Sequence, residues 1–152
     1  MKKESPEQRA QYLALVNEKL GIQLKEWEQD GLGEHPDPQQ LERFCRFYLD
    51  HPEIHPIRRA ESVDQILGSL SMRFESNSVT DPDLELVRQV VKDASDNVWA
   101  ANFLLAESDA YDPAVDPGDC AVNNWLLTES GLDMDKLKAQ QARFRDPADN
   151  LE

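Results

Sequence analysis

Several prolines in this chain directly follow a residue that caps helices, and this pairing constrains the fold more than any other feature. Ser5-Pro6, Asp37-Pro38 and Thr80-Asp81-Pro82 each precede apolar residues at helical spacing. Ser, Thr and Asp side chains accept hydrogen bonds from the first free N–H groups of a helix, and proline fits there because its missing N–H would have no partner. No stretch combines sustained apolar alternation with β-branched residues and hairpin turns. The sequence therefore predicts an all-α fold.

The apolar spacing predicts one irregular domain of six to eight helices. The second helix must end near Asp50, because the residues before Pro52 and Pro56 avoid the helical conformation. A break is also expected at Ser95-Asp96, since both residues are good caps. The predicted helices are Pro6–Leu20, Asp37–Asp50, Glu61 or Ser62 to Phe74, Thr80 to about Ser108 with the break, about Asp119–Ser130, and Asp133 to just before Asp146.

The segment Val98–Ala106 is apolar nearly all round. A helix of that kind is usually covered by neighbours on several sides. We therefore predict that a buried helix at about 97–108 forms the centre of the domain. The side chains expected in the core are Trp99, Phe103 and Leu105, with Trp125 from a later helix largely buried as well.

A chain of 152 residues is most simply one domain, 1–152, with frayed ends at 1–4 and 146–152. Leu151-Glu152 also fits a cloning remnant. The charged N-terminus has no apolar segment behind it, and the longest apolar stretch is far too short to span a bilayer. We therefore expect a cytoplasmic protein with no membrane partner.

Negative charge is concentrated in the middle third of the chain. The net charge is −14, and residues 75–119 carry 11 acidic and 2 basic side chains, a net of −9. Such a field attracts basic partners and repels nucleic acid. The dense basic clusters, Arg43/Arg46 and Arg58/Arg59, are flanked by acidic residues, and the pI near 4.5 is opposite to that of typical nucleic-acid binders. We therefore expect a basic protein partner and no direct binding of nucleic acid.

A carboxylate-rich segment follows the predicted central helix. It joins five carboxylates to one aromatic side chain and to Pro113 and Pro117, which restrict the backbone. A preordered acidic loop loses less entropy on binding than a flexible one, and interface cores favour aromatic anchors. The predicted partner-binding residues are Glu107, Asp109, Tyr111, Asp112, Asp116 and Asp119.

Two groups of residues resemble metal sites in composition but not in spacing. His51 and His55 lie four apart near carboxylates, yet a proline follows each, so they do not share a regular helix. The aspartates after the predicted central helix supply oxygen ligands suited to calcium, but the glycine that an EF-hand loop requires falls late, at Gly118. We predict no metal and no cofactor, and leave open whether a metal binds near His35, His51 and His55.

Nucleophilic catalysis has little support in the sequence. No glycine-rich phosphate loop, Gly-x-Ser-x-Gly elbow or His-Glu-x-x-His helix occurs. Cys45 lies on an apolar helix face and is expected to pack in the core. Cys120 follows Asp119, and a neighbouring carboxylate raises the pKa of a thiol. We expect both cysteines to be free thiols, with a disulfide as the alternative, and we predict that the protein is not an enzyme.

These observations favour a small acidic binding protein. Its sharpest form is an inhibitor, an immunity protein or an antitoxin-like protein that neutralises a basic partner such as a nuclease by mimicking the charge of nucleic acid. Two alternatives stay open. One is a helical enzyme or enzyme subunit with a metal or carboxylate site, and the other is an assembly component that self-associates as a homo-oligomer.

Overall fold

The computed structural model describes residues 3–25, 31–105 and 112–145, and every regular element within these ranges is helical. The all-α prediction is confirmed, with seven α-helices and two short 3-10 helices in the described ranges. None of the described helices is long and apolar enough to cross a membrane. The helices are α1 (Pro6–Leu20), η1 (Gly31–Glu34), η2 (Pro38–Gln40), α2 (Leu41–Asp50), α3 (Pro56–Glu75), α4 (Asp81–Ala94), α5 (Ala101–Leu104), α6 (Pro117–Thr128) and α7 (Met134–Arg145).

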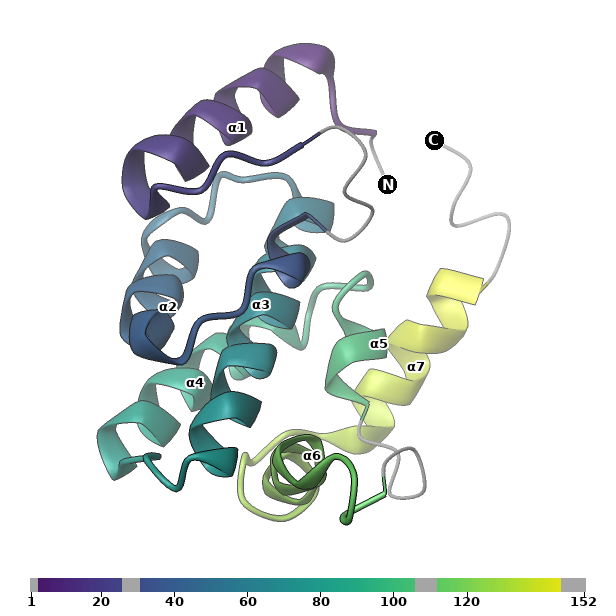
Figure 1. Cartoon of the computed structure of the whole chain (residues 1–152). Helices are drawn as coiled ribbons and strands as arrows, with labels where there is room; N and C mark the ends of the chain where they lie inside the picture. The colour runs from purple at the N-terminus through teal and green to yellow at the C-terminus, as the bar shows by residue number, and fades with distance from the viewer. Residues whose placement is uncertain (1–2, 26–30, 106–111, 146–152) are drawn as a thin grey trace.

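Helix α3, of 20 residues, lies at the centre of the fold. It contacts α2, α4, α5 and α6 as well as η1 and η2, and Figure 1 shows it running through the middle of these elements. A helix with neighbours on several sides must bury more than one face. The buried residues of α3 are Ala60, Ser62, Val63, Gln65, Ile66, Leu67, Ser69, Leu70 and Ser71.

Small polar side chains allow α3 to be covered on its less apolar side. The Ser69 hydroxyl donates to the Gln65 carbonyl at 2.8 Å and accepts from the Asp37 N–H at 3.0 Å. The Gln65 amide donates to the His35 carbonyl at 3.1 Å. Hydrogen-bonded polar groups can be buried at low cost, so these bonds fasten the segment between η1 and η2 to α3.

The prediction of a central helix at about 97–108 is wrong. In the described part of that segment only α5 is α-helical, residues 95–100 form irregular turns, and residues 106–108 lie outside the described ranges. The Asn97 side chain donates to the Pro56 carbonyl at 2.8 Å and accepts from the Trp99 N–H at 2.9 Å, which holds the chain in a turn against the start of α3.

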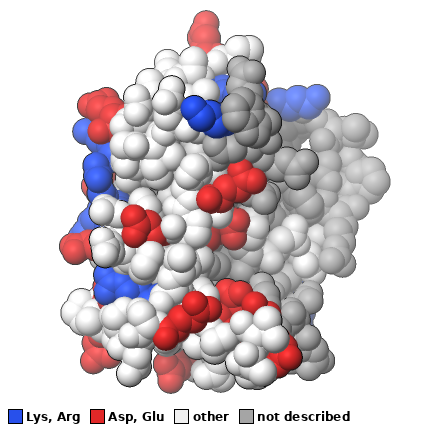
Figure 2. Space-filling model, viewed as in Figure 1, with Lys and Arg blue, Asp and Glu red and all other residues white. Residues whose placement is uncertain are grey.

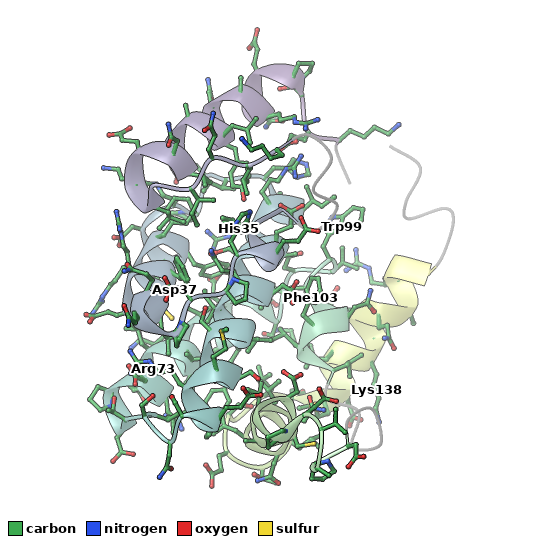
Figure 3. The ribbon with its side chains drawn as sticks, in the orientation of Figure 1. His35, Asp37, Arg73, Trp99, Phe103 and Lys138 are labelled. Carbon is green, nitrogen blue, oxygen red and sulfur yellow. The ribbon has the colours of Figure 1, made fainter. Side chains whose placement is uncertain are left out.

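The three residues of that segment that were predicted in the core differ in how deeply they are buried. Phe103 is 36% exposed and was wrongly expected in the core, whereas Trp99 and Leu105 are partly buried against it. Figure 3 shows Trp99 and Phe103 on the side of α3 that faces α5, and Asp37 and Arg73 on the side toward α2. The burial expected of Trp125 is confirmed, since this residue is 2% exposed.

Helix α3 begins at Pro56, five or six positions before the predicted start at Glu61 or Ser62. His55 is extended, as a residue before proline should be, and its Nδ1 accepts a hydrogen bond from the Ile57 N–H at 3.2 Å. In the sequence, His55-Pro56 predicts only where the preceding helix ends. Here proline occupies the first helical position and histidine serves as the cap.

Helix α6 begins at Pro117, two positions before the predicted start at about Asp119, but two other helix starts follow the cap signals closely. Ser5 and Gln8 form a reciprocal capping box at the start of α1, with distances of 3.1 and 2.8 Å. Thr80 and Asp83 do the same at the start of α4, at 3.2 and 3.0 Å. Helix α2 buries Leu41, Phe44, Cys45 and Tyr48, so the prediction that Cys45 packs in the core is confirmed.

Gly118, near the start of α6, allows this helix to lie directly against α3. A Cβ at this position would lie 2.3 Å from the backbone oxygen of Ser71 and 2.7 Å from Cγ of Glu75. Backbone atoms cannot move aside as a flexible side chain can. The absence of a side chain at Gly118 therefore fixes how closely α6 approaches α3.

Replacing Gly118 by alanine should separate α6 from α3. We expect Gly118→Ala to lower the free energy of unfolding by about 1–3 kcal/mol, the usual range for overpacking, although alanine favours helix over glycine. Urea denaturation measures this change. The control Asn124→Ala, at an exposed position of the same helix, should change stability by less than about 0.5 kcal/mol; equal effects would contradict the close approach.

The two aromatic residues Trp125 and Phe103 should differ in their contribution to stability. Trp125→Ala removes a buried side chain and should cost about 3–5 kcal/mol. Phe103→Ala removes a side chain that is 36% exposed and should cost about 1 kcal/mol. Thermal or urea unfolding measures the loss of stability in each variant. A larger loss for Phe103→Ala than for Trp125→Ala would indicate that α5 lies at the centre of the core.

Candidate functional site

The predicted binding residues lie at the start of α6, where the structure describes three of the six. Asp112 is exposed, and Asp116 and Asp119 are partly exposed. Glu107, Asp109 and Tyr111 lie outside the described residues, so the expected aromatic anchor has no structural account. The structure thus brings together three of the predicted carboxylates.

Backbone hydrogen bonds order the turn that precedes α6. The Asp112 carbonyl accepts from the Val115 N–H at 3.0 Å and from the Asp116 N–H at 2.7 Å, and the Asp112 carboxylate accepts from the Ala114 N–H at 2.9 Å. The Asp116 carbonyl then accepts from the Cys120 N–H at 3.0 Å inside the helix. The turn is therefore continuous with α6, which Gly118 holds against α3.

The charges of all three carboxylates act on the thiol of Cys120. Desolvation, followed by the charges of Asp116, Asp112 and Asp119, raises the pKa of this thiol above its ordinary value. The direction agrees with the sequence-based expectation for Cys120, and both cysteines are free. The thiol is thus held in its neutral form and is unsuited to act as a nucleophile.

A fourth carboxylate and an exposed apolar side chain complete this surface. Glu75 at the end of α3 is exposed and lies beside Gly118. Val115, within the turn, is 72% exposed. Figure 2 shows acidic side chains at the lower edge of the molecule, where Figure 1 places α6. We call Asp112, Asp116, Asp119 and Glu75 the α6 acidic surface.

Most of the ion pairs among the described residues lie away from this surface. They join Arg58 to Glu4 and Glu61, Arg59 to Asp93, Arg73 to Asp83, Arg88 to Glu85, and Lys136 to Asp96. Within the described ranges, no residue of the α6 acidic surface forms an ion pair. Its negative charge is therefore available to a cation from outside the molecule.

A groove of about 590 Å3 opens between the start of α1, residues 51–56, the turn after α4, and α7. On its floor, the guanidinium of Arg59 lies 3.8 Å from the ring centre of Tyr48 and donates to the Tyr48 and His51 carbonyls and to Asp93, at 3.0, 2.7 and 2.9 Å. The Tyr48 hydroxyl donates to the same carboxylate at 2.7 Å. These mutual bonds clamp α2, α3 and α4 together, which gives the floor a structural role.

The histidines have structural partners. His51 Nδ1 lies 3.0 Å from Glu53, and the pKa of Glu53 is lowered by its own backbone N–H and by His51. His55 caps α3, and the His35 carbonyl receives Gln65. In the part of the chain that the structure describes, no three His, Cys, Asp or Glu side chains gather as metal ligands would.

Comparison of the chain with protein-family models, with curated proteins and with solved structures finds no match.

The carboxylates around Cys120 should control its reactivity. Asp116→Asn removes one negative charge, lowers the thiol pKa and so increases the thiolate fraction at neutral pH. We expect alkylation of Cys120 by iodoacetamide to become about two to three times faster. Asp135→Asn, at an exposed carboxylate that does not act on this thiol, should leave the rate unchanged. If both variants reacted at the wild-type rate, the charge of Asp116 would have no effect on the pKa of the Cys120 thiol.

Proposed function

We propose that the protein is a non-catalytic binding domain that uses the α6 acidic surface to occupy a basic surface of another protein. The partner class is a cytoplasmic protein that handles nucleic acid, such as a nuclease, whose groove for phosphates receives the carboxylates instead. The protein would then act as an inhibitor, in the manner of an immunity protein or an antitoxin. Carboxylates on a rigid helical frame can match a surface built for phosphates.

The observation that carries the proposal is the combination of order and unpaired charge. Four carboxylates lie on a turn and on helices whose positions are set by backbone hydrogen bonds and by the contact at Gly118. Within the described residues none of them is neutralised by a cation. A preordered surface loses less entropy on binding, and its field speeds the encounter with a positive partner.

The exposed side chain of Val115 adds an apolar contact inside the charged surface. It lies between Asp112 and Asp116 and is 72% exposed. Interfaces commonly surround an apolar centre with a polar rim. Val115 therefore takes the anchoring position for which the sequence suggested Tyr111.

A second reason for acidic residues at this position is helix stabilisation. Asp116 and Asp119 lie at the N-terminal end of α6, where the helix dipole favours negative charge by about 0.3–1 kcal/mol per residue. Stability and binding separate the two roles. A purely structural role would reduce stability on substitution and leave partner binding unchanged in the folded protein.

The test compares two triple charge reversals that change the net charge equally. Asp112, Asp116 and Asp119 are replaced by lysine in one variant, and the exposed residues Glu7, Glu18 and Asp135 in the other. Each immobilised protein, first shown to be folded by circular dichroism, captures proteins from a lysate of its own cells for mass spectrometry. We expect basic proteins to bind the wild type and the control, and to be lost from the first variant.

Kinetics with a captured partner sharpen the result. The association rate constant for the first variant should fall by about tenfold or more at low salt, and its dependence on salt should flatten. Val115→Ser should instead raise the dissociation rate. If the two triple variants capture the same proteins at the same rates, the α6 acidic surface is not the binding site.

A further inference from the structure

A second charged surface, of opposite sign, lies between the end of α1 and the outer face of α2. It is a hollow of about 340 Å3, which we call the α2 hollow. Figure 2 shows basic side chains along the left edge of the molecule, where Figure 1 places α2. The residues that line the hollow are Lys19, Leu20, Arg43, Arg46, Phe47, Asp50 and His51.

The cations of the α2 hollow are available to a ligand. Arg43 and Arg46 are exposed, and neither forms a hydrogen bond or an ion pair within the described ranges. Lys19 is 51% exposed, and its Nζ lies 3.8 Å from the carboxylate of its exposed neighbour Glu18. By contrast, the less exposed Arg58 and Arg59 are both ion-paired. In a chain of net charge −14, two exposed arginines at one hollow that form no ion pair with a described residue are a local exception.

The elements that carry these side chains are fixed. Helix α1 ends at Leu20 and is capped by Gly21, which has a φ of 68° and donates its N–H to the Asn17 carbonyl. Leu20 and Phe47 are 7% and 5% exposed and form an apolar base. The rings of Phe47 and His51 lie 5.0 Å apart.

We propose that the α2 hollow binds the phosphate group of a small phosphorylated compound. The planar guanidinium groups of Arg43 and Arg46 match phosphate oxygens, and Lys19 adds a third positive charge. The apolar base suits a short organic group attached to the phosphate. The volume of the hollow falls within the usual range of small-molecule sites, about 300–1,000 Å3.

The charge of the whole protein limits the size of this ligand. At physiological ionic strength a charge acts over about 8 Å, so a single phosphate at the hollow mainly meets its lining charges, in which the cations Lys19, Arg43 and Arg46 outnumber the one carboxylate, Asp50. A nucleic-acid strand would extend beyond that distance over a molecule of net charge −14 and would be repelled. The hollow therefore favours a monomeric phosphate over a polyanion.

Titration with phenyl phosphate and with inorganic phosphate, by calorimetry and by amide chemical shifts, tests the proposal. The wild type should bind phenyl phosphate with a Kd of about 1 mM or tighter, with shifts centred on residues 19–21 and 43–51. The ionic strength is matched with sodium chloride. An absence of saturable binding up to about ten times that Kd, or shifts centred elsewhere, would overturn the proposal.

Two matched double variants assign the site. Arg43→Gln with Arg46→Gln should weaken the binding of phenyl phosphate by about tenfold or more. Arg9→Gln with Lys92→Gln removes the same charge at exposed positions outside the hollow and should change the Kd less than about twofold. Equal weakening by the two pairs would mean that only net charge matters, and would refute a site at α2.

Two further ligands test the chemical class. Benzoate should bind much more weakly than phenyl phosphate, and a short single-stranded oligonucleotide should bind no more tightly. Equal binding of benzoate would refute phosphate as the recognised group, and tighter binding of the oligonucleotide would refute a small ligand. None of these variants alters the α6 acidic surface, so this proposal and the proposed function succeed or fail independently.

Discussion

The burial of α3 on several sides is the constraint on which the rest of the structure depends. Its buried residues are of two kinds: apolar ones, such as Val63, Ile66 and Leu70, and small polar ones, such as Ser69. A buried hydroxyl needs a hydrogen-bond partner, and Ser69 finds two. This arrangement permits α2, α4, α5 and α6 to surround one helix.

The position of the α6 acidic surface follows from the same packing. Because Gly118 carries no side chain, the start of α6 lies against the end of α3, and this contact brings Glu75 beside the turn that carries the aspartates. Glu75 and aspartates that follow it by 37 to 44 positions in the sequence thereby form one surface. Rigidity comes from apolar and backbone contacts, while the charged groups remain at the surface, where desolvation does not oppose them.

The sequence predicted the helix starts at Ser5, Asp37 and Thr80 because caps and proline act locally. The prediction of the central helix was wrong because apolar content alone does not determine which helix is buried. The segment at 98–106 is more apolar than α3, but Asn97 holds its first residues in a turn, and α3 is covered through serines that a hydropathy pattern counts as exposed. The turn at Asn97 and the burial of α3 both depend on contacts between residues distant in the sequence. The same is true of the contact at Gly118 and of the α2 hollow.

The distribution of charge depends on packing in the same way. Asp83, Asp93 and Asp96 belong to the most acidic segment of the chain, yet each is paired with a cation from another helix. The carboxylates of residues 75–119 therefore do not all contribute equally to the negative field. Those without an ion pair among the described residues include the aspartates of the turn before α6. Within the described ranges, Arg43 and Arg46 lack such partners and leave positive charge at the α2 hollow. Net charge governs the field only at long range, while within about 8 Å the unpaired side chains decide which ligand is attracted.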